Sequence, residues 1–278
     1  MRRIVAGALL ACLVSGASLA GDAAGSVVEQ GVRQAATNYI ESYLQGDPAG
    51  MEASIHPAIV RRGVVRSKKA GESFLMNANA ETILNDAREG RIKLPEGEAS
   101  VAVDVLDVSE DVASARVSSS VSHDNLTLVR SGDTWRVAAT LWTPPAKSQL
   151  SAEESDLAEV KRTVEEMIRA CLSHDTERLH QLVHPAVSRR MVRPAEGEAI
   201  CALTDLNAQE FLEASARSGG GTVTPEVTVL EVYRDIAAVR VTFADAVDYL
   251  QLMRQGTRWM VVNCVASVRA GSPLHAAR

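Results

Sequence analysis

The stretch HPAIVRR at residues 56–62 returns as HPAVSRR at residues 184–190, 128 positions further along the chain. Downstream of a loop that is four residues shorter in the second copy, the offset becomes 124 and pairs Trp135 with Trp259. Two registers that run through both halves of the chain indicate a tandem duplication. The fold predicted for one half is therefore predicted for the other as well.

Each copy opens with apolar residues at helical spacing, and in the first copy a Ser-x-x-Glu capping box precedes them at Ser26. Asp47 and Pro48 then supply an N-cap and a first helical residue for a short second helix. Because a residue before proline is restricted to extended geometry, this helix is expected to end near His56. Asn79 and its counterpart in the second copy are expected to cap a third helix.

After the helices, the period of the apolar residues changes from 3.6 to 2, and valine-rich runs are separated by tight turns. The predicted strands are residues 100–108, 112–121, 125–130 and 134–141, and in the second copy 226–233, 236–243, 247–254 and 258–265. Three helices followed by an antiparallel meander predict an α+β unit whose helices pack on one face of a curved sheet.

Two motifs of the second copy, VLEVYRDIA at residues 229–237 and DYL at residues 248–250, resemble the nuclear-transport-factor-2-like superfamily. Within it, the sequence is most similar to the bacterial group called "putative lumazine-binding". The resemblance implies two tandem cone-shaped domains, each enclosing a pocket between helices and a bent sheet. Domains of this fold often dimerise through their sheets, so the fusion implies an intrachain pseudo-dimer that is a monomer in solution. Activity is not implied, because the superfamily holds isomerases, dehydratases and members that only bind.

The N-terminus carries two arginines, an apolar run and small residues before position 21, which is the pattern of a signal peptide. We therefore expect export, to the periplasm or outside the cell, with a lipid anchor at Cys12 as an alternative because LLAC resembles a lipobox. The expected division of the chain is a signal peptide (1–20), a first domain (26–143), a linker (144–150), a second domain (151–269) and a tail (270–278).

Composition narrows the classes of function. The chain is 46% hydrophobic and 23% charged, which is typical of a soluble globular protein, and we expect no transmembrane segment. A net charge of −6 argues against nucleic acid as a partner. The sequence shows no metal-ligand spacing, phosphate loop or dinucleotide fingerprint, so we predict neither a metal site nor a cofactor.

The repeated histidines His56 and His184 allow two interpretations. Each could contact a ligand or act as an acid or base at a pocket mouth, or each could form a structural corner by bonding to backbone at a helix end. Asp124 and Asp248 each start an Asp-x-Leu-x-Leu pattern, which places the carboxylate on the same strand face as two leucines. If that face lines a pocket, burial would raise the carboxylate pKa; the alternative is a turn residue.

The paired arginines at 61–62 and 189–190 could form an anion-attracting rim, or they could be a solvated face. Tyr39 and Tyr43 are pocket candidates in the first copy only, and Tyr249 follows Asp248. The candidate ligand-binding residues are His56, Tyr39, Tyr43, Asp124, His184, Arg189, Arg190, Asp248 and Tyr249.

Three hypotheses of function follow. The first is an exported, non-catalytic protein that binds a small apolar or heteroaromatic molecule, or another protein. The second is an isomerase, dehydratase or hydrolase that uses Asp248 and His184 as acid and base. The third is a scaffold with collapsed pockets that acts only through its surface.

Overall fold

A computed structural model describes residues 18–67, 73–95, 97–98, 100–146, 153–193, 201–206 and 225–268. Residues 1–17 of the predicted signal peptide lie outside the described residues. The third helix expected behind Asn207, most of the predicted linker and the predicted C-terminal tail also lie outside them.

Each half is an α+β unit, as the sequence predicts, but in the first half two strands, β1 and β2, come before the third helix. The first half contains α1 (Ser18–Gln45), α2 (Pro48–Ser54), β1 (Ile55–Arg66), β2 (Ser73–Asn79), α3 (Ala80–Arg88), β3 (Val101–Ser109), β4 (Val112–Ser119), β5 (His123–Ser131) and β6 (Thr134–Thr143). The second half contains α4 (Glu154–Ser173), α5 (Thr176–Leu182), β7 (Val183–Arg193), β8 (Ala202–Leu206), β9 (Glu226–Tyr233), β10 (Ile236–Thr242), β11 (Ala246–Gln255) and β12 (Arg258–Val268).

The caps of the short helices follow the sequence. Asp47 accepts a hydrogen bond from the Ala49 amide at the start of α2, and Asn79 accepts one from the Thr82 amide at the start of α3. The first helix differs from expectation, because α1 already begins at Ser18 and Ser26 lies inside it. The helix also runs through the predicted cleavage position. In the described part of the chain, no helix is both long and apolar enough to span a membrane.

Each half forms a six-stranded sheet, with the strand orders β2-β1-β6-β5-β4-β3 and β8-β7-β12-β11-β10-β9. The four-strand meander of each copy is confirmed, but the sheet is larger and mixed, because β1 pairs in parallel with β6 and β7 with β12. The repeated histidine–arginine stretch itself forms the parallel strand. Sequence reasoning missed it because a strand buried on both faces lacks the alternation of a half-solvated one.

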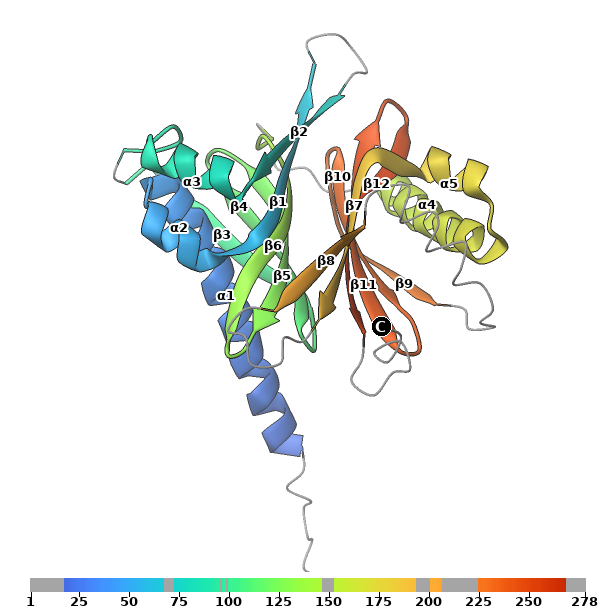
Figure 1. The fold of residues 1–278 in the computed structure, drawn as a ribbon, viewed down its shortest axis with the longest axis horizontal. Helices are drawn as coiled ribbons and strands as arrows, with labels where there is room; N and C mark the ends of the chain where they lie inside the picture. Colours follow the sequence, from blue (N-terminus) through green and yellow to red (C-terminus); the bar gives the residue numbers. More distant parts are fainter. Residues whose placement is uncertain are drawn as a thin grey trace, which may run out of the picture.

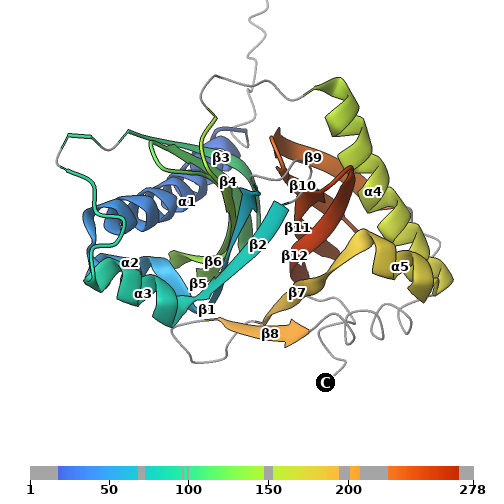
Figure 2. The same cartoon turned by 90° about the horizontal axis from the view of Figure 1, so that it is seen from above.

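The two sheets face each other in the middle of the molecule and the helices cover their outer faces (Figures 1 and 2). Trp135 and Trp259 are buried in the apolar cores between helices and sheet, as expected for strand tryptophans. A third apolar cluster joins the halves and includes Val129 from β5 and Val265 from β12. The register of both sheets shifts at equivalent places, between Thr127 and Leu128 and between residues 251 and 252, and such bulges bend a sheet.

Contacts between the halves are reciprocal. Arg62 donates to the carbonyl oxygen of Val262, and its counterpart Arg190 donates to that of Ala138 at 2.8 Å. Ala138 and Val262 are themselves counterparts at the offset of 124. The same contact is therefore made twice, once in each direction between the halves. Such reciprocal contacts are typical of a dimer with two-fold symmetry.

A second reciprocal pair crosses the contact. Arg116 pairs with Glu231 at 3.0 Å, and Arg240 pairs with Asp107 at 2.8 Å. In the first pair the arginine belongs to the first half, and in the second pair it belongs to the second half. Arg116 matches Arg240, and Asp107 matches Glu231, at the offset of 124. The intrachain pseudo-dimer implied by the resemblance is therefore confirmed.

Candidate functional site

The two repeated histidines form the same backbone corner. The Nδ1 atom of His56 accepts the amide N–H of Ala58 at 3.0 Å, and that of His184 accepts the N–H of Ala186 at 3.0 Å. An accepting Nδ1 leaves the proton on Nε2, and His56 uses it to reach the carbonyl oxygen of Cys201 at 2.9 Å. Burial lowers the pKa of both rings. Of the two interpretations, the structure shows the structural corner.

The paired arginines separate onto the two faces of their strand, because successive side chains alternate. Arg61 and Arg189 lie on the face covered by helices, whereas Arg62 and Arg190 lie between the halves. Arg61 is 9% exposed and Arg62 is 6% exposed, so the first pair forms neither a solvated face nor a rim. Arg190 is 3% exposed and pairs with Asp205 at 2.6 Å besides its backbone contact.

The same alternation separates Asp248 from Tyr249. Asp248 points toward the helices of its own half, whereas Tyr249 belongs to the apolar cluster between the halves and donates to Asp107 of the first half. Arg190 and Tyr249, both named as candidate ligand-binding residues, therefore contact the other half. Sequence reasoning chose them because they adjoin residues of the opposite face.

The helix-facing side of the first sheet holds a stacked arginine. The Arg61 guanidinium lies 4.6 Å from the ring centroid of Tyr43 and 4.8 Å from that of Trp142. Its Nε donates to the hydroxyl oxygen of Tyr39 at 3.1 Å. Burial raises the pKa of Tyr39 to about 12, so its hydroxyl stays protonated and can donate a hydrogen bond. The structure thus brings both predicted tyrosines to one charged group.

Asp124 lies on the same face and is fully buried. Its Oδ2 accepts from the Ser122 hydroxyl, but its Oδ1 has no hydrogen-bond partner in the described part of the chain. The hydroxyl of Thr140, also fully buried on this face, has no partner among the described residues either. Burial raises the pKa of Asp124, and the nearby Arg61 and Ser122 only partly oppose it. We define the first-half interior site as Tyr39, Tyr43, Arg61, Asp124, Thr140 and Trp142.

The second half keeps the charged pair but changes its surroundings. Asp248 lies 3.6 Å from Arg189 and accepts from the Cys264 thiol at 3.7 Å. Burial raises the pKa of both Asp248 and Cys264. The counterparts of Tyr39, Tyr43, Thr140 and Trp142 are Met167, Cys171, Cys264 and Ala266. Cys201 lies elsewhere, between the halves, where its amide donates to the Ser131 hydroxyl at 3.1 Å.

The structure does not bring His184 and Asp248 together as an acid–base pair. Asp248 contacts Arg189 and Cys264 on the helix-facing side of its sheet. The positive charge of Arg62, which lies between the halves, contributes to the lowered pKa of His184 after burial itself. The two candidates therefore lie on opposite faces of the second sheet.

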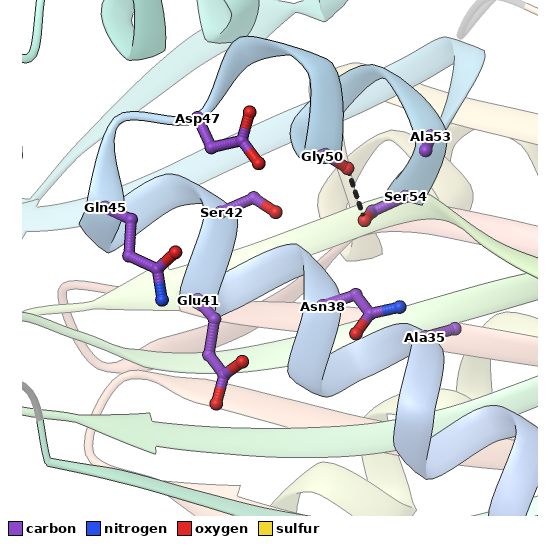
Figure 3. Close-up of a pocket in the computed structure, with 9 residues that line it drawn as sticks. All are labelled: Ala35, Asn38, Glu41, Ser42, Gln45, Asp47, Gly50, Ala53 and Ser54. Carbon is purple, nitrogen blue, oxygen red and sulfur yellow. Dashed lines mark hydrogen bonds between the residues drawn. The ribbon is translucent and has the colours of Figure 1, made fainter.

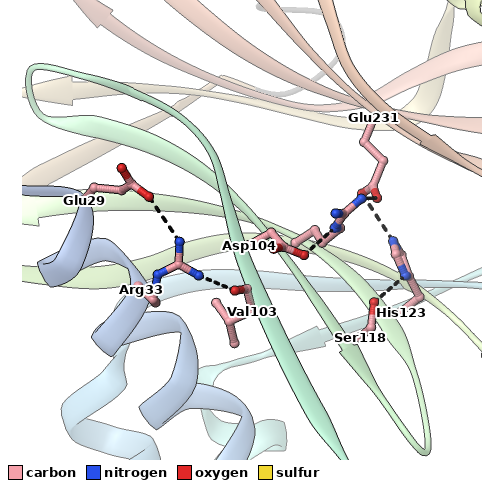
Figure 4. A network of polar contacts seen from close by, with 8 residues as sticks. Glu29, Arg33, Val103, Asp104, Ser118, His123 and Glu231 are labelled. Carbon is pink, nitrogen blue, oxygen red and sulfur yellow. Dashed lines mark hydrogen bonds and ion pairs between the residues drawn. The ribbon is translucent and has the colours of Figure 1, made fainter. Parts of the chain in front are cut away.

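A polar network that sequence reasoning missed crosses between the halves (Figure 4). His123 is only 5% exposed, and its Nε2 lies 3.2 Å from a carboxylate oxygen of Glu231. Its Nδ1 lies 3.1 Å from the Ser118 hydroxyl, and its ring stacks on Tyr233 with the centroids 3.7 Å apart. No repeat signal could reveal it, because the counterpart of His123 is Val247. The network tethers Glu231, which also pairs with Arg116, and we assign it to the contact between the halves.

Two surface grooves lie outside the helix layer, at equivalent places. The first, between α1 and α2, encloses about 290 Å³ (Figure 3). Its lining residues are Ala35, Asn38, Glu41, Ser42, Gln45, Asp47, Gly50, Ala53 and Ser54. The second groove encloses about 350 Å³, and there the counterpart of Gly50 is Arg178, which donates to Gln181 at 2.7 Å. None of the sequence-predicted site residues lines either groove.

Comparison with known proteins agrees with this architecture. The sequence model of the family described as "Putative lumazine-binding" matches twice, over residues 28–143 and 155–266. A search of curated proteins finds no match.

Solved structures similar to the chain include three from bacteria. An NTF2-like protein of unknown function from Silicibacter pomeroyi is 20% identical and covers 43% of this chain and 100% of its own, with a TM-score of 0.35. A "ketosteroid isomerase-like protein" from Erwinia carotovora atroseptica is 12% identical and covers 42% and 96%, with a TM-score of 0.32. A "putative dehydratase from the NTF2-like family" of Streptomyces avermitilis is 19% identical and covers 42% and 99%, with a TM-score of 0.32. With the family model matched over both halves, the chain belongs to the putative lumazine-binding family and carries two tandem copies of its domain.

Proposed function

We propose that this protein is an exported, non-catalytic binder of a small heteroaromatic molecule, held at the first-half interior site. The observation that carries the proposal is the fully buried Oδ1 of Asp124, which has no partner among the described residues. Leaving a buried polar atom unpaired costs about 1–3 kcal/mol, and more for a charged group. A bound molecule that donates a hydrogen bond to this oxygen would remove that cost.

The surroundings of Asp124 favour a flat ligand with polar edges. Tyr39 keeps a hydroxyl proton that can point to a ligand acceptor, and Thr140 offers a second unused hydroxyl. The rings of Tyr43 and Trp142 supply aromatic surface beside them. The family description, which names a heteroaromatic compound, is consistent with this chemistry.

Export rests on the N-terminal pattern alone, in which Arg2 and Arg3 precede an apolar run and a small-residue cleavage site. Periplasmic fractionation of the native host, with and without residues 1–20, tests it. Retention of the intact chain in the cytosol would contradict the proposal.

A thermal-shift screen against flavin and pterin analogues tests the binding proposal. We expect a compound that stabilises the wild type, loses its effect on Asp124→Leu, and keeps it on the matched second-half variant Asp248→Leu. Native mass spectrometry of the protein purified from its host would then reveal a bound molecule of the same class. Equal stabilisation of the wild type and Asp124→Leu would overturn the assignment of the site.

A second candidate function is acid–base catalysis at Asp124. It is favoured by the raised pKa of a carboxyl group that keeps one oxygen free of protein partners. A carboxylate of this kind can move a proton on a bound carbonyl compound. Deuterium uptake by the bound ligand in D₂O, present in the wild type and absent in Asp124→Asn, would establish it in place of simple binding.

A further inference from the structure

We propose that the ligand of the first-half interior site is an elongated amphiphile, with a hydrogen-bond-donating head at Asp124 and an apolar tail at Phe74 and Met76. The inference rests on the proposed function and adds the ligand's shape, its direction and its stoichiometry. Phe74 and Met76 are large apolar side chains that the fold leaves 57% and 54% exposed on β2.

Strand register connects the buried carboxylate to these exposed side chains. Asp124 pairs with Trp142, Trp142 with Gly63, and Gly63 with Met76, on four consecutive strands. Residues directly paired across strands point to the same face of a sheet. Phe74 pairs with Val65, two residues beyond Gly63, and therefore joins the same face.

Packing confirms which face this is. Ala78, which alternates with Met76 on β2, packs against the core between the helices and the first sheet. Leu75, on the opposite face, packs against the apolar cluster between the halves. Phe74 and Met76 thus extend the helix-facing side of the sheet beyond the part that the helices cover.

Asp124, Trp142, Gly63 and Met76 form a row across the four strands, and the missing side chain of Gly63 lets the Trp142 indole lie close to the sheet. A Cβ atom on Gly63 would lie 2.3 Å from the Trp142 indole, so the indole lies directly against the backbone of β1. Its half-buried ring therefore bridges the buried end of the row and the exposed end. Three strand spacings of about 4.8 Å separate Asp124 from Met76, which sets a ligand length of roughly 14 Å.

The second half lacks this path. The counterparts of Phe74, Met76 and Trp142 are Ala202, Thr204 and Ala266, and Met191 stands in place of Gly63. Its carboxylate, Asp248, is already engaged by Arg189 and Cys264. One chain therefore binds one ligand.

Calorimetric titration with a series of straight-chain primary amides tests the proposal, since each amide has a neutral N–H head and a tail of chosen length. We expect one amide per chain, with binding about fourfold tighter for each added methylene until the tail spans the row, and constant beyond. The double variant Phe74→Ser/Met76→Ser should bind short amides like the wild type and lose the gain for long ones. Asp124→Leu should weaken all members by a similar factor.

Leu172→Ser, which removes a comparably exposed apolar side chain from α4, is the matched control and should leave the series unchanged. If amides bind in an Asp124-dependent way but the Phe74→Ser/Met76→Ser variant shows the same length dependence, or two amides bind per chain, the elongated ligand is refuted and the binding function stands. If no amide binds, or if Asp124→Leu binds all of them as the wild type does, the elongated ligand is refuted too; the proposed function falls only if the flavin and pterin analogues also show no stabilisation that depends on Asp124.

Discussion

Arg61 and Arg62 are consecutive residues of β1 whose guanidinium groups serve different parts of the molecule. Arg61 stacks on Tyr43 and Trp142 inside the first domain, and Arg62 donates to the Val262 carbonyl of the second. Because successive side chains of a strand point to opposite faces of the sheet, two consecutive arginines in β1 must point to different sides. The duplicated arginine pair therefore recurs because each copy needs one arginine within its domain and one at the contact between domains.

Arg62→Met and Arg190→Met are each expected to lower the free energy of unfolding by about 1.5–3 kcal/mol, the value of hydrogen bonds to a charged group. Burial and the charge of Arg190 together lower the pKa of Arg62 to about 10, which shows that the two cations repel each other. Either single replacement already relieves this repulsion, so the double variant should lose more than the sum of the single losses. Urea unfolding measures all three, with the exposed Arg162→Met as control. Strict additivity would contradict the coupling.

The halves are expected to recognise each other without the covalent link. Residues 21–146 and 151–278, expressed as separate chains, should associate one to one, because the reciprocal contacts and the apolar cluster between the sheets do not involve the linker. Light scattering should give the mass of a heterodimer for the mixture and the mass of one chain for the intact protein. An intact protein at twice its chain mass would mean that the surfaces between the domains also join separate molecules.

Much of the fold could be read from the sequence because the duplication supplied two samples of every element. The meander strands, the caps at Asp47 and Asn79 and the turn at His56-Pro57 depend on neighbours in sequence, and they were predicted. The parallel strand β1 was missed because its pattern depends on burial of both faces. Ser26 was predicted to cap the first helix, but α1 begins eight residues earlier.

The candidate site was predicted only in part, for a physical reason. Tyr39, Tyr43 and Asp124 were identified because they lie on apolar faces of regular elements, where orientation follows from the period. Arg190 and Tyr249 were named as candidates although they lie at the contact between the halves, since the sequence did not show which side chains of β7 and β11 face the helices. Trp142 is a residue of the first copy without an aromatic counterpart, so the repeat gave no reason to single it out.

Gly63→Ala is expected to destabilise the first domain, because the new methyl would lie within van der Waals distance of the Trp142 indole, whose ring must shift. Overpacking of this kind typically costs about 1–3 kcal/mol. In the double variant Gly63→Ala/Trp142→Ala the clash is absent, so Gly63→Ala should lower the free energy of unfolding much less in that background. The difference is the coupling energy of a double-mutant cycle. Circular dichroism and tryptophan emission of the single variant report whether the ring has moved. A neutral single variant would show that the indole leaves β1 without cost.

Replacement of Asp124 by asparagine should change how stability depends on pH. Burial raises the pKa of Asp124 above the value of about 3.9 for an unfolded chain, so between these two values the folded state binds more protons than the unfolded state. The free energy of unfolding contributed by this group is thus fully present below the unfolded pKa and is lost as pH rises through the folded pKa. Asp124→Asn cannot titrate, and we expect its stability to fall less steeply above pH 4 and to exceed that of the wild type at pH 7.

The difference between urea unfolding curves of wild type and variant across pH 4–8 isolates this effect from all other titrating groups. Asp248→Asn is the matched comparison, because burial raises the pKa of Asp248 as well, while Arg189 and Cys264 already engage its carboxylate. We expect a larger gain for Asp124→Asn than for Asp248→Asn, since of the two carboxylates only that of Asp124 has a completely buried oxygen without a partner among the described residues. If Asp124→Asn were less stable than the wild type at pH 7, the carboxylate would be held ionised by Arg61. Burial would then not control the charge of this carboxylate, contrary to the expected pH dependence.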